Sequence, residues 1–300
     1  MVSEVQVEKV TFDSDGVLLV GRLYRPGDAV DTRLPAVVVT GSWLTVKEQM
    51  PQVYARRLAE QGFAALDFDF THYGESGGEP RDLESPSRKS RDIRAAVTFL
   101  AGRPDVDAQR IGALGVCASS GYTAVNAAGD ARVRSLAMVA PWLHDPDLVA
   151  LMYGGKEGVS QRLAAGFAAR ARYDNTGEVD YVAAVSTTDP SAAMSGDFPY
   201  YVDATRGAVP QWANRFAVQG WNEWLTYNAI PVARNITIPT LLVHSENGAI
   251  PDGARAFHAQ LTGPKELIWI EGTQFDFYDR EPTVSQAVEH VVRHFRSTLD

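Results

Sequence analysis

The sequence predicts an α/β protein in which helices cover both faces of a mostly parallel sheet and a cap is inserted late in the chain. Short β-branched runs alternate with helical stretches over most of the 300 residues, as in α/β folds. The alternation stops at residue 146 and resumes at Thr237. We therefore predict a core formed by residues 1–145 and 236–300 and a cap formed by residues 146–235.

The first half of the predicted core begins with a hairpin and continues with buried strands. Residues 5–24 alternate apolar and polar side chains around Asp13-Ser14-Asp15-Gly16, which predicts two antiparallel strands joined by a tight turn. Continuous apolar runs, typical of strands buried on both faces, occupy residues 35–40, 63–68, 111–115 and 133–139. The spacing of apolar residues predicts helices at residues 46–61, 88–101 and 118–128.

The predicted cap carries helical stretches and a dense aromatic cluster between Phe198 and Tyr227. Aromatic side chains can pack a cap onto a core or roof an apolar pocket, and we expect both. Such a pocket favours a hydrophobic or aromatic acyl substrate. After the cap the alternation resumes, with strands at residues 239–244 and 266–270 and helices at residues 252–261 and 283–297.

Composition and charge exclude several classes of protein. A hydrophobic share of 45% and a charged share of 22% exclude a disordered, collagen-like or coiled-coil chain. The single cysteine excludes an intrachain disulfide and fits a reducing compartment. The net charge of −9 argues against a nucleic-acid partner. Without a signal-peptide pattern or a long apolar run, we expect a cytoplasmic protein with no membrane partner, no cofactor and no metal, either monomeric or homodimeric.

A nucleophile elbow is predicted at Gly115-Val116-Cys117-Ala118-Ser119, which connects a strand to a helix. The small flanking residues allow a sharp turn, and the helix behind it directs free backbone N–H groups toward the central side chain. The pattern therefore predicts that Cys117 is an exposed nucleophile with a lowered pKa. The alternative is a buried cysteine that acts as a small hydrophobic residue.

With this elbow, the hairpin and the Gly74-Glu75-Ser76-Gly77 loop, the sequence resembles the α/β-hydrolase superfamily over nearly its whole length. The residues of these segments are similar to those of the dienelactone-hydrolase-like and X-prolyl-peptidase-like branch of the superfamily. The resemblance implies an α/β-hydrolase fold, and dienelactone hydrolases also use a cysteine at the nucleophile position. It further implies an oxyanion hole, which we assign to the backbone N–H groups of Ala118 and Trp43.

The resemblance also places a catalytic acid in the loop that follows residues 239–244. The usual aspartate position falls on Asn247, and because this loop is one residue short, the neighbouring Glu246 could serve instead. A second acid position used in the superfamily follows the preceding strand, where Asp145 stands. For either carboxylate, the alternative is a solvated loop side chain.

The position of the catalytic histidine holds Gln274, which departs from the family pattern. A glutamine cannot act as a general base, although it can hydrogen-bond a thiol or a carbonyl group. His72 and His144 follow predicted strands at the correct edge of the sheet, so either could substitute for the missing base. For His72, the alternative is a hydrogen bond that stabilises its own loop.

These residues predict a cysteine-dependent hydrolase or acyltransferase that acts on an ester, lactone or thioester through an acyl-Cys117 intermediate. Deacylation by water needs a general base, so hydrolysis should be slow. The alternatives are a non-covalent lyase, isomerase or cyclase that uses the oxyanion hole, and a degenerate binding protein with a blocked pocket. The residues expected to contact a small-molecule acyl substrate are Trp142, His144, Tyr201, Trp221 and Trp224.

Overall fold

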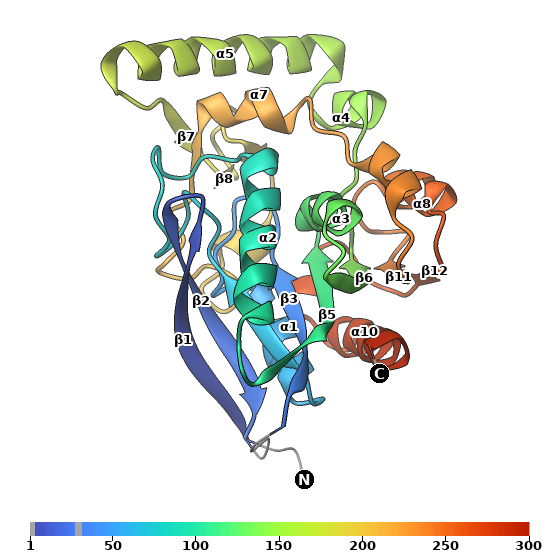
Figure 1. The fold of residues 1–300 in the computed structure, drawn as a ribbon. Helices are drawn as coiled ribbons and strands as arrows, with labels where there is room; N and C mark the ends of the chain where they lie inside the picture. The colour runs from blue at the N-terminus through green and yellow to red at the C-terminus, as the bar shows by residue number, and fades with distance from the viewer. Residues whose placement is uncertain (1–3, 28–31, 300) are drawn as a thin grey trace.

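One eight-stranded sheet runs through the described part of the computed structural model, which covers residues 4–27 and 32–299. Its strand order is β1-β2-β4-β3-β5-β6-β11-β12, and helices cover both of its faces (Figure 1). This arrangement confirms the predicted α/β architecture. Residues 1–3, on which part of the expectation about a signal peptide rests, lie outside the described residues.

The predicted hairpin is formed by β1 (Val5–Ser14) and β2 (Val17–Pro26), which pair antiparallel along their whole length. The turn between them has positive φ angles of 50° at Asp15 and 82° at Gly16. A two-residue hairpin turn that follows the twist of its strands needs this conformation, which aspartate and glycine tolerate. Strand β2 then pairs antiparallel with β4 (Ala64–Phe68), which connects the hairpin to the parallel part of the sheet.

The remaining strands run parallel: β3 (Leu34–Thr40), β4, β5 (Val106–Val116), β6 (Val133–Val139), β11 (Thr240–His244) and β12 (Lys265–Trp269). The central residues of β3, β5, β6 and β11 are buried on both faces, which explains their continuous apolar runs. Because these strands are parallel, their carboxyl ends all lie at one edge of the sheet. Binding sites of parallel sheets are found at this edge.

The predicted core helices are present with slightly shifted bounds: α1 (Met50–Ala59), α2 (Pro86–Ala101), α3 (Ser119–Gly129), α8 (Pro251–Gln260) and α10 (Thr283–Leu299). Helix α2 begins after Ser85, whose hydroxyl accepts a hydrogen bond from the Arg88 N–H, and Pro86 occupies the first helical position. Helix α2 packs against α3, and α1 packs against α10 (Figure 1).

Between β6 and β11 lies the stretch predicted as the cap, residues 146–235, which we call the insert; it adds no strand to the eight-stranded sheet. Its long helix α5 (Gly155–Thr176) lies across one end of the molecule, next to α7 (Trp221–Trp224) (Figure 1). The insert also contains strands of only two or three residues. Such strands are too short to show an alternating pattern, so the sequence did not predict them. The further elements of the insert are α4 (Pro146–Met152), β7 (Tyr181–Ala183), β8 (Val185–Ser186), β9 (Met194–Ser195), α6 (Pro199–Val202), β10 (Arg215–Ala217), η1 (Val218–Gly220) and η2 (Ile230–Asn235).

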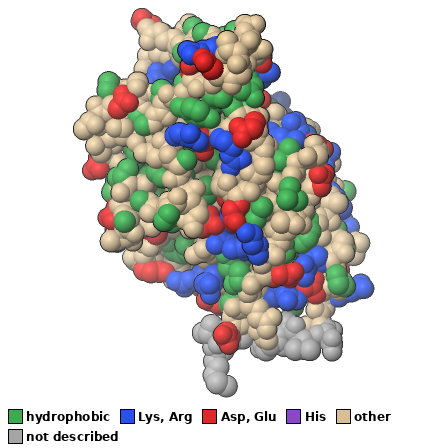
Figure 2. All heavy atoms as spheres, turned by 90° about the vertical axis from the view of Figure 1, so that its left-hand side faces the viewer, with side chains coloured by type: hydrophobic (Ala, Val, Ile, Leu, Met, Phe, Trp, Pro, Cys, Tyr) green, Lys and Arg blue, Asp and Glu red, His purple; other side chains and the backbone are tan. Residues whose placement is uncertain are grey.

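Basic and acidic side chains are intermixed on the face of the molecule that Figure 2 shows. Ion pairs such as Arg103–Glu8 and Lys9–Glu75 connect β1 to neighbouring loops. Among the helices within residues 4–27 and 32–299, none combines the length and the apolar character that a membrane span requires.

Candidate active site

The predicted elbow is present, with Cys117 at a positive φ of 58° between β5 and α3. This conformation is unfavourable for a residue with a side chain, so the surrounding backbone must hold it. The Cys117 N–H donates to the Val139 carbonyl (2.9 Å), and the Cys117 carbonyl accepts from the Trp142 N–H (3.0 Å). A Cβ atom at Gly115 would lie 2.7 Å from the backbone of Ser120, so only glycine allows α3 to start this close to the strand.

The serine at the last position of the elbow has a structural role of its own. The Ser119 hydroxyl accepts a hydrogen bond from the Val116 N–H and donates one to the Val116 carbonyl, both at 3.1 Å. It also accepts from the Thr40 hydroxyl at the end of β3 (2.9 Å). These bonds satisfy backbone groups that the sharp turn leaves without strand partners.

Cys117 lies in the wall of a cavity of about 290 Å³ between the sheet edge and the insert. The side chain is only 5% exposed, so the prediction of an exposed thiol is wrong, although the residue borders the cavity. The open cavity also contradicts the blocked pocket expected of a degenerate binding protein. Most of its wall is apolar, with aromatic rings from Trp43, Trp142, Tyr153, Tyr201, Trp224 and Phe275.

Polar groups from three distant segments surround the thiol. The hydroxyls of Ser42 and Tyr278 and the amide of Gln274 lie next to the sulfur of Cys117, where they can donate hydrogen bonds to a thiolate. Burial raises the pKa of Cys117, and these donors, together with the Ala118 N–H, lower it without overcoming the burial. The expectation of a lowered thiol pKa is therefore wrong, because loss of solvent outweighs the start of the helix.

The hydroxyls beside the thiol form a connected cluster. The Ser42 oxygen lies 3.3 Å from the Tyr201 hydroxyl and 3.2 Å from the Tyr278 hydroxyl, and each of these groups can donate or accept. Tyr278 lies in the short helix α9 (Asp276–Asp279), and its hydroxyl accepts a hydrogen bond from the side-chain nitrogen of Gln274 (3.4 Å), so both side chains lie on the same side of the loop. Neither Ser42 nor Tyr278 was predicted as a site residue, although Ser42 directly precedes Trp43 and Tyr278 follows Gln274 by four residues.

The two backbone N–H groups assigned to the oxyanion hole are available. Within the described residues, the Trp43 N–H donates to no acceptor, and the Ala118 N–H faces only the sulfur of Cys117. The neighbouring N–H groups are occupied, because Ser42 donates to the Met50 sulfur (3.5 Å) and Leu44 to the Glu84 carboxylate (3.3 Å). Free donors beside a nucleophile are what an oxyanion hole requires.

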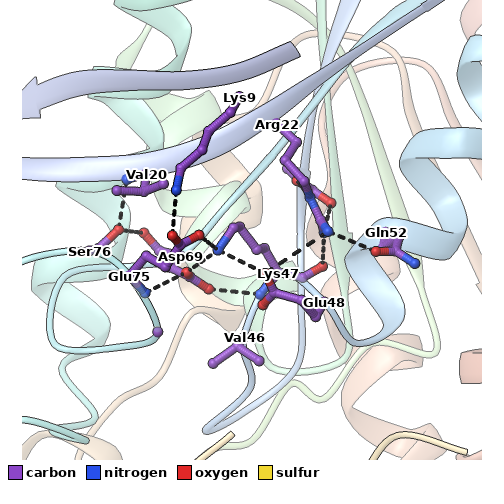
Figure 3. Close-up of polar contacts among 12 residues, drawn as sticks. Lys9, Val20, Arg22, Val46, Lys47, Glu48, Gln52, Asp69, Glu75 and Ser76 are labelled. Carbon is purple, nitrogen blue, oxygen red and sulfur yellow. Dashed lines mark hydrogen bonds and ion pairs between the residues drawn. The ribbon is translucent and has the colours of Figure 1, made fainter. Parts of the chain in front are cut away.

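Buried charges hold one end of the loop that carries Trp43 (Figure 3). Asp69 accepts from both the backbone N–H (2.8 Å) and the ammonium (2.7 Å) of Lys47. The Lys47 carbonyl accepts from Arg22 (2.6 Å), whose guanidinium also binds Asp67 with two hydrogen bonds. Burial lowers the pKa of Lys47, but the nearby carboxylates of Asp69, Glu75 and Glu48 together raise it, so the ammonium stays charged.

A second buried ion pair holds the middle of the same loop. Glu84 is fully buried and accepts from the Lys89 ammonium and the Tyr122 hydroxyl, both at 2.7 Å, as well as from the Leu44 N–H. Leu44 has a positive φ of 60°, which needs such support. The loop with the proposed oxyanion donor is therefore fixed at two points by charges that water does not reach.

Gln274 lies beside Cys117, as predicted, and its amide is fully engaged. The side-chain oxygen accepts from the Ala249 N–H (2.9 Å), and the side-chain nitrogen donates to the Ala140 carbonyl (2.9 Å). These bonds tie the loop after β12 to the loops after β6 and β11. No atom of this amide can take up the thiol proton.

The structure does not bring the predicted acids to the thiol. Glu246 and Asn247 are exposed and border a different surface pocket, and Glu246 pairs with Arg255. Asp145 instead caps α4, because its carboxylate accepts from the N–H groups of Asp147 and Leu148. Glu246 therefore matches the solvated-loop alternative, whereas Asp145 has a capping role that was not predicted.

Neither histidine that could replace the base reaches the cavity. The His72 backbone N–H donates to the Gly77 carbonyl (2.8 Å), and burial lowers the pKa of its side chain to about 4. His144 accepts from the Trp142 indole N–H (2.9 Å) and lies 3.0 Å from the Trp224 carbonyl, to which it donates. Burial lowers the pKa of His144 to about 4 as well, so it is neutral and orients two tryptophans of the wall.

Two of the residues expected to contact substrate lie behind the cavity wall. His144 supports Trp142 and Trp224 from outside, and Trp221 packs against Trp43 with 5.8 Å between ring centres. The other three, Trp142, Tyr201 and Trp224, border the cavity directly. The aromatic cluster therefore divides into a lining layer and a supporting layer, a distinction that sequence spacing does not encode.

Comparisons with known proteins agree with this architecture. The model of the X-Pro dipeptidyl-peptidase (S15) family matches residues 15–273. An uncharacterized protein of Pseudomonas aeruginosa, PA2218, is 32% identical over 93% of this chain and 77% of its own length. The crystal structure of PA2218 superimposes with a TM-score of 0.87 over 98% of this chain and 94% of the PA2218 chain, at 28% identity.

Two fungal proteins extend the comparison. The α/β hydrolase GrgF from Penicillium sp. sh18 has the same fold, with a TM-score of 0.83 over 98% of this chain and 99% of the GrgF chain at 22% identity. The polyketide transferase claH of Penicillium crustosum is 33% identical over 66% of this chain and 57% of its own length. The chain therefore belongs to the X-Pro dipeptidyl-peptidase (S15) family of α/β-hydrolase-fold proteins, and it is an enzyme of the hydrolase or acyltransferase type.

Proposed function

We propose that this enzyme transfers an acyl group from an ester, lactone or thioester through an acyl-Cys117 intermediate. One observation carries the proposal: Cys117 stands on a strained elbow at a cavity, beside two backbone N–H groups that the protein itself does not use. A nucleophile next to unused donors is the arrangement that acyl transfer requires.

The reaction has two halves. In the first, the sulfur of Cys117 bonds to the substrate carbonyl carbon, and the N–H groups of Ala118 and Trp43 stabilise the charge that develops on the oxygen. The bond to the leaving oxygen or sulfur then breaks, and the thiol proton reaches the leaving group through the hydroxyl of Ser42 or Tyr278. In the second half, an acceptor attacks the acyl group, the carbon–sulfur bond breaks, and the acceptor's proton returns to the sulfur.

The proposal favours transfer over fast hydrolysis. A raised thiol pKa leaves little thiolate at neutral pH, and none of the described residues that line the cavity is a histidine or a carboxylate that could activate water. A stronger nucleophile than water, such as an amine or a thiol, needs less activation. The relative named as a polyketide transferase supports the same choice.

A non-covalent lyase, isomerase or cyclase reaction is the second candidate. The observation that favours it is the raised pKa of Cys117, together with the two hydroxyls that lie next to its sulfur. In this reaction the hydroxyl cluster would stabilise a developing oxyanion on the substrate, and Cys117 would only contribute shape.

Intact-protein mass spectrometry distinguishes the two candidates. After incubation with a 4-nitrophenyl ester, the native chain should gain one acyl mass, and Cys117→Ala should gain none because no other cysteine exists. Cys117→Ser serves as the matched variant, with a hydroxyl in place of the thiol. Turnover that persists in Cys117→Ala would establish the non-covalent reaction instead.

A further inference from the structure

The cavity at Cys117 carries one formal charge. Arg162 of α5 borders it, and no aspartate or glutamate does so within the described part of the chain. Apart from the amide of Gln274, the rest of the wall is aromatic, aliphatic, sulfur-containing or hydroxyl-bearing. An apolar cavity with one cation selects for a ligand that has an apolar body and one anionic group.

Arg162 is held in place by groups that do not neutralise it. One terminal nitrogen, Nη1, donates to the carbonyls of Tyr153 and Gly158, both at 3.1 Å. The guanidinium carbon lies 5.4 Å from the centre of the Tyr153 ring and 5.6 Å from that of Trp221. Because these contacts fix the plane of the guanidinium, its remaining N–H groups have a defined direction.

The remaining donors of Arg162 are unused. Its Nη2 and Nε groups donate to no acceptor among residues 4–27 and 32–299, and no carboxylate there lies within ion-pair distance. A partly buried cation without a partner costs free energy, which a bound anion would offset. The planar fork of arginine fits two oxygens of a carboxylate or phosphate at once.

Arg162 and Cys117 border the same cavity. Cys117 belongs to the core, whereas Arg162 belongs to the insert, and the Tyr153 hydroxyl lies within electrostatic reach of both. Met152, which precedes Tyr153 and also borders the cavity, is 48% exposed, so this part of the wall opens to solvent.

We propose that the substrate carries a carboxylate or phosphate that pairs with Arg162 while its acyl carbon lies at Cys117. This inference rests on the proposed function, because it assigns the reacting end of the substrate to the thiol. A carboxylate would belong to the acyl group, as in a half-ester of a dicarboxylic acid. A phosphate would belong to the leaving group, as in a pantetheine-type thioester.

The test compares substrates matched in length but not in charge. Mono(4-nitrophenyl) glutarate is compared with 4-nitrophenyl pentanoate, and hexanoyl-4′-phosphopantetheine with hexanoyl-pantetheine. The readout is the ratio of kcat/KM for the anionic to the neutral member of each pair. We expect the native enzyme to prefer the anionic member of one pair, and the identity of that pair distinguishes a carboxylate from a phosphate.

Three variants separate recognition of charge from support of the fold. Arg162→Met should lower the preferred ratio by roughly 10- to 100-fold, the range of a charge-assisted hydrogen bond, and Arg162→Lys should lower it less. Arg170→Met on the same helix is the control, because Arg170 is exposed and pairs with Asp174. A ratio that Arg162→Met leaves unchanged would overturn the inference, even if Cys117 is acylated.

A binding measurement keeps the test independent of the chemistry. Monomethyl glutarate and methyl pentanoate are titrated calorimetrically into Cys117→Ala and into Cys117→Ala/Arg162→Met, with 4′-phosphopantetheine and pantetheine as the second pair. Tighter binding of an anionic member that needs Arg162 supports the inference even if no ester acylates the native thiol, in which case only the proposed function fails. Equal binding of both members, combined with no charge preference in turnover, would overturn it.

Discussion

At the scale of single residues, the thiol environment decides how this site reacts. Ser42, Tyr278 and Gln274 act to lower the pKa of the Cys117 thiol, yet burial keeps that pKa above its usual value. Iodoacetamide should therefore modify the native chain slowly at pH 7 and much faster above pH 9, whereas the unfolded chain should react like a free thiol. Mass spectrometry over time measures both rates, and fast native modification at pH 7 would contradict the burial argument.

Removing one hydrogen-bond donor near Cys117 should slow the alkylation of its thiol further. Tyr278→Phe removes a hydroxyl that can donate to the thiolate, and hydrogen bonds to charged groups are worth about 1.5–3 kcal/mol, so alkylation at pH 8 should fall by roughly tenfold or more. Tyr200→Phe is the matched control, since that ring packs against Tyr278 without bonding the sulfur. Equal rates in the two variants would show that the Tyr278 hydroxyl does not act on Cys117.

Gln274, which occupies the position of the catalytic histidine in related enzymes, offers a direct gain-of-function test. Gln274→His would place an imidazole beside Cys117, and general-base help is worth roughly 10²–10⁴-fold when the geometry is right. We expect the low end of that range, because Glu246 points to solvent and pairs with Arg255, so nothing orients the new ring. Burst kinetics with an activated ester should show faster turnover and less accumulated acyl-enzyme; slower turnover would mean that the glutamine itself assists the reaction.

At the scale of elements, the loop that carries Trp43 depends on buried charge. Lys47→Met leaves the 1%-exposed Asp69 without its cation, which should destabilise the fold by roughly 3–5 kcal/mol and slow acylation. Lys47→Met/Asp69→Asn removes both charges and should recover part of the stability. Urea unfolding and acylation rates measure the two effects. If the double variant is no more stable than the single one, the pair does not act as a unit.

The elements themselves were largely predictable, whereas the contacts across them were not. The hairpin, the parallel strands and the elbow follow from local spacing and from small residues such as Gly115, so the sequence reveals them. The cluster around the thiol joins Ser42, Cys117 and Tyr278, which are far apart in the chain, and only the tertiary structure brings them together. Glu246 was a reasonable candidate acid by position, but the direction of its side chain depends on Arg255 on the next helix.

At the scale of the whole molecule, buried histidines should make stability depend on pH. Burial lowers the pKa of His144 and of His244 to about 4, whereas an unfolded histidine titrates near 6.5. Below pH 6.5 the unfolded chain therefore binds protons that the folded chain does not, and stability falls as the pH drops toward 4. Each histidine contributes roughly 3 kcal/mol to this loss.

Chemical unfolding at pH 7.5, 6 and 5 checks this dependence. His144→Gln removes one of the buried titrating groups, so its stability should decline less steeply with falling pH than that of the native chain. Parallel declines in the two proteins would show that His144 takes up no extra proton on unfolding.

Because the only cysteine of the chain borders the cavity, its rate of alkylation reports whether a ligand occupies that cavity. Any compound that settles beside Cys117 shields the thiol, so the loss of alkylation with rising concentration yields a dissociation constant without knowledge of the reaction. Compound libraries and cell extracts can therefore be screened by competition for one mass adduct. No background arises from a second thiol, because the chain contains none.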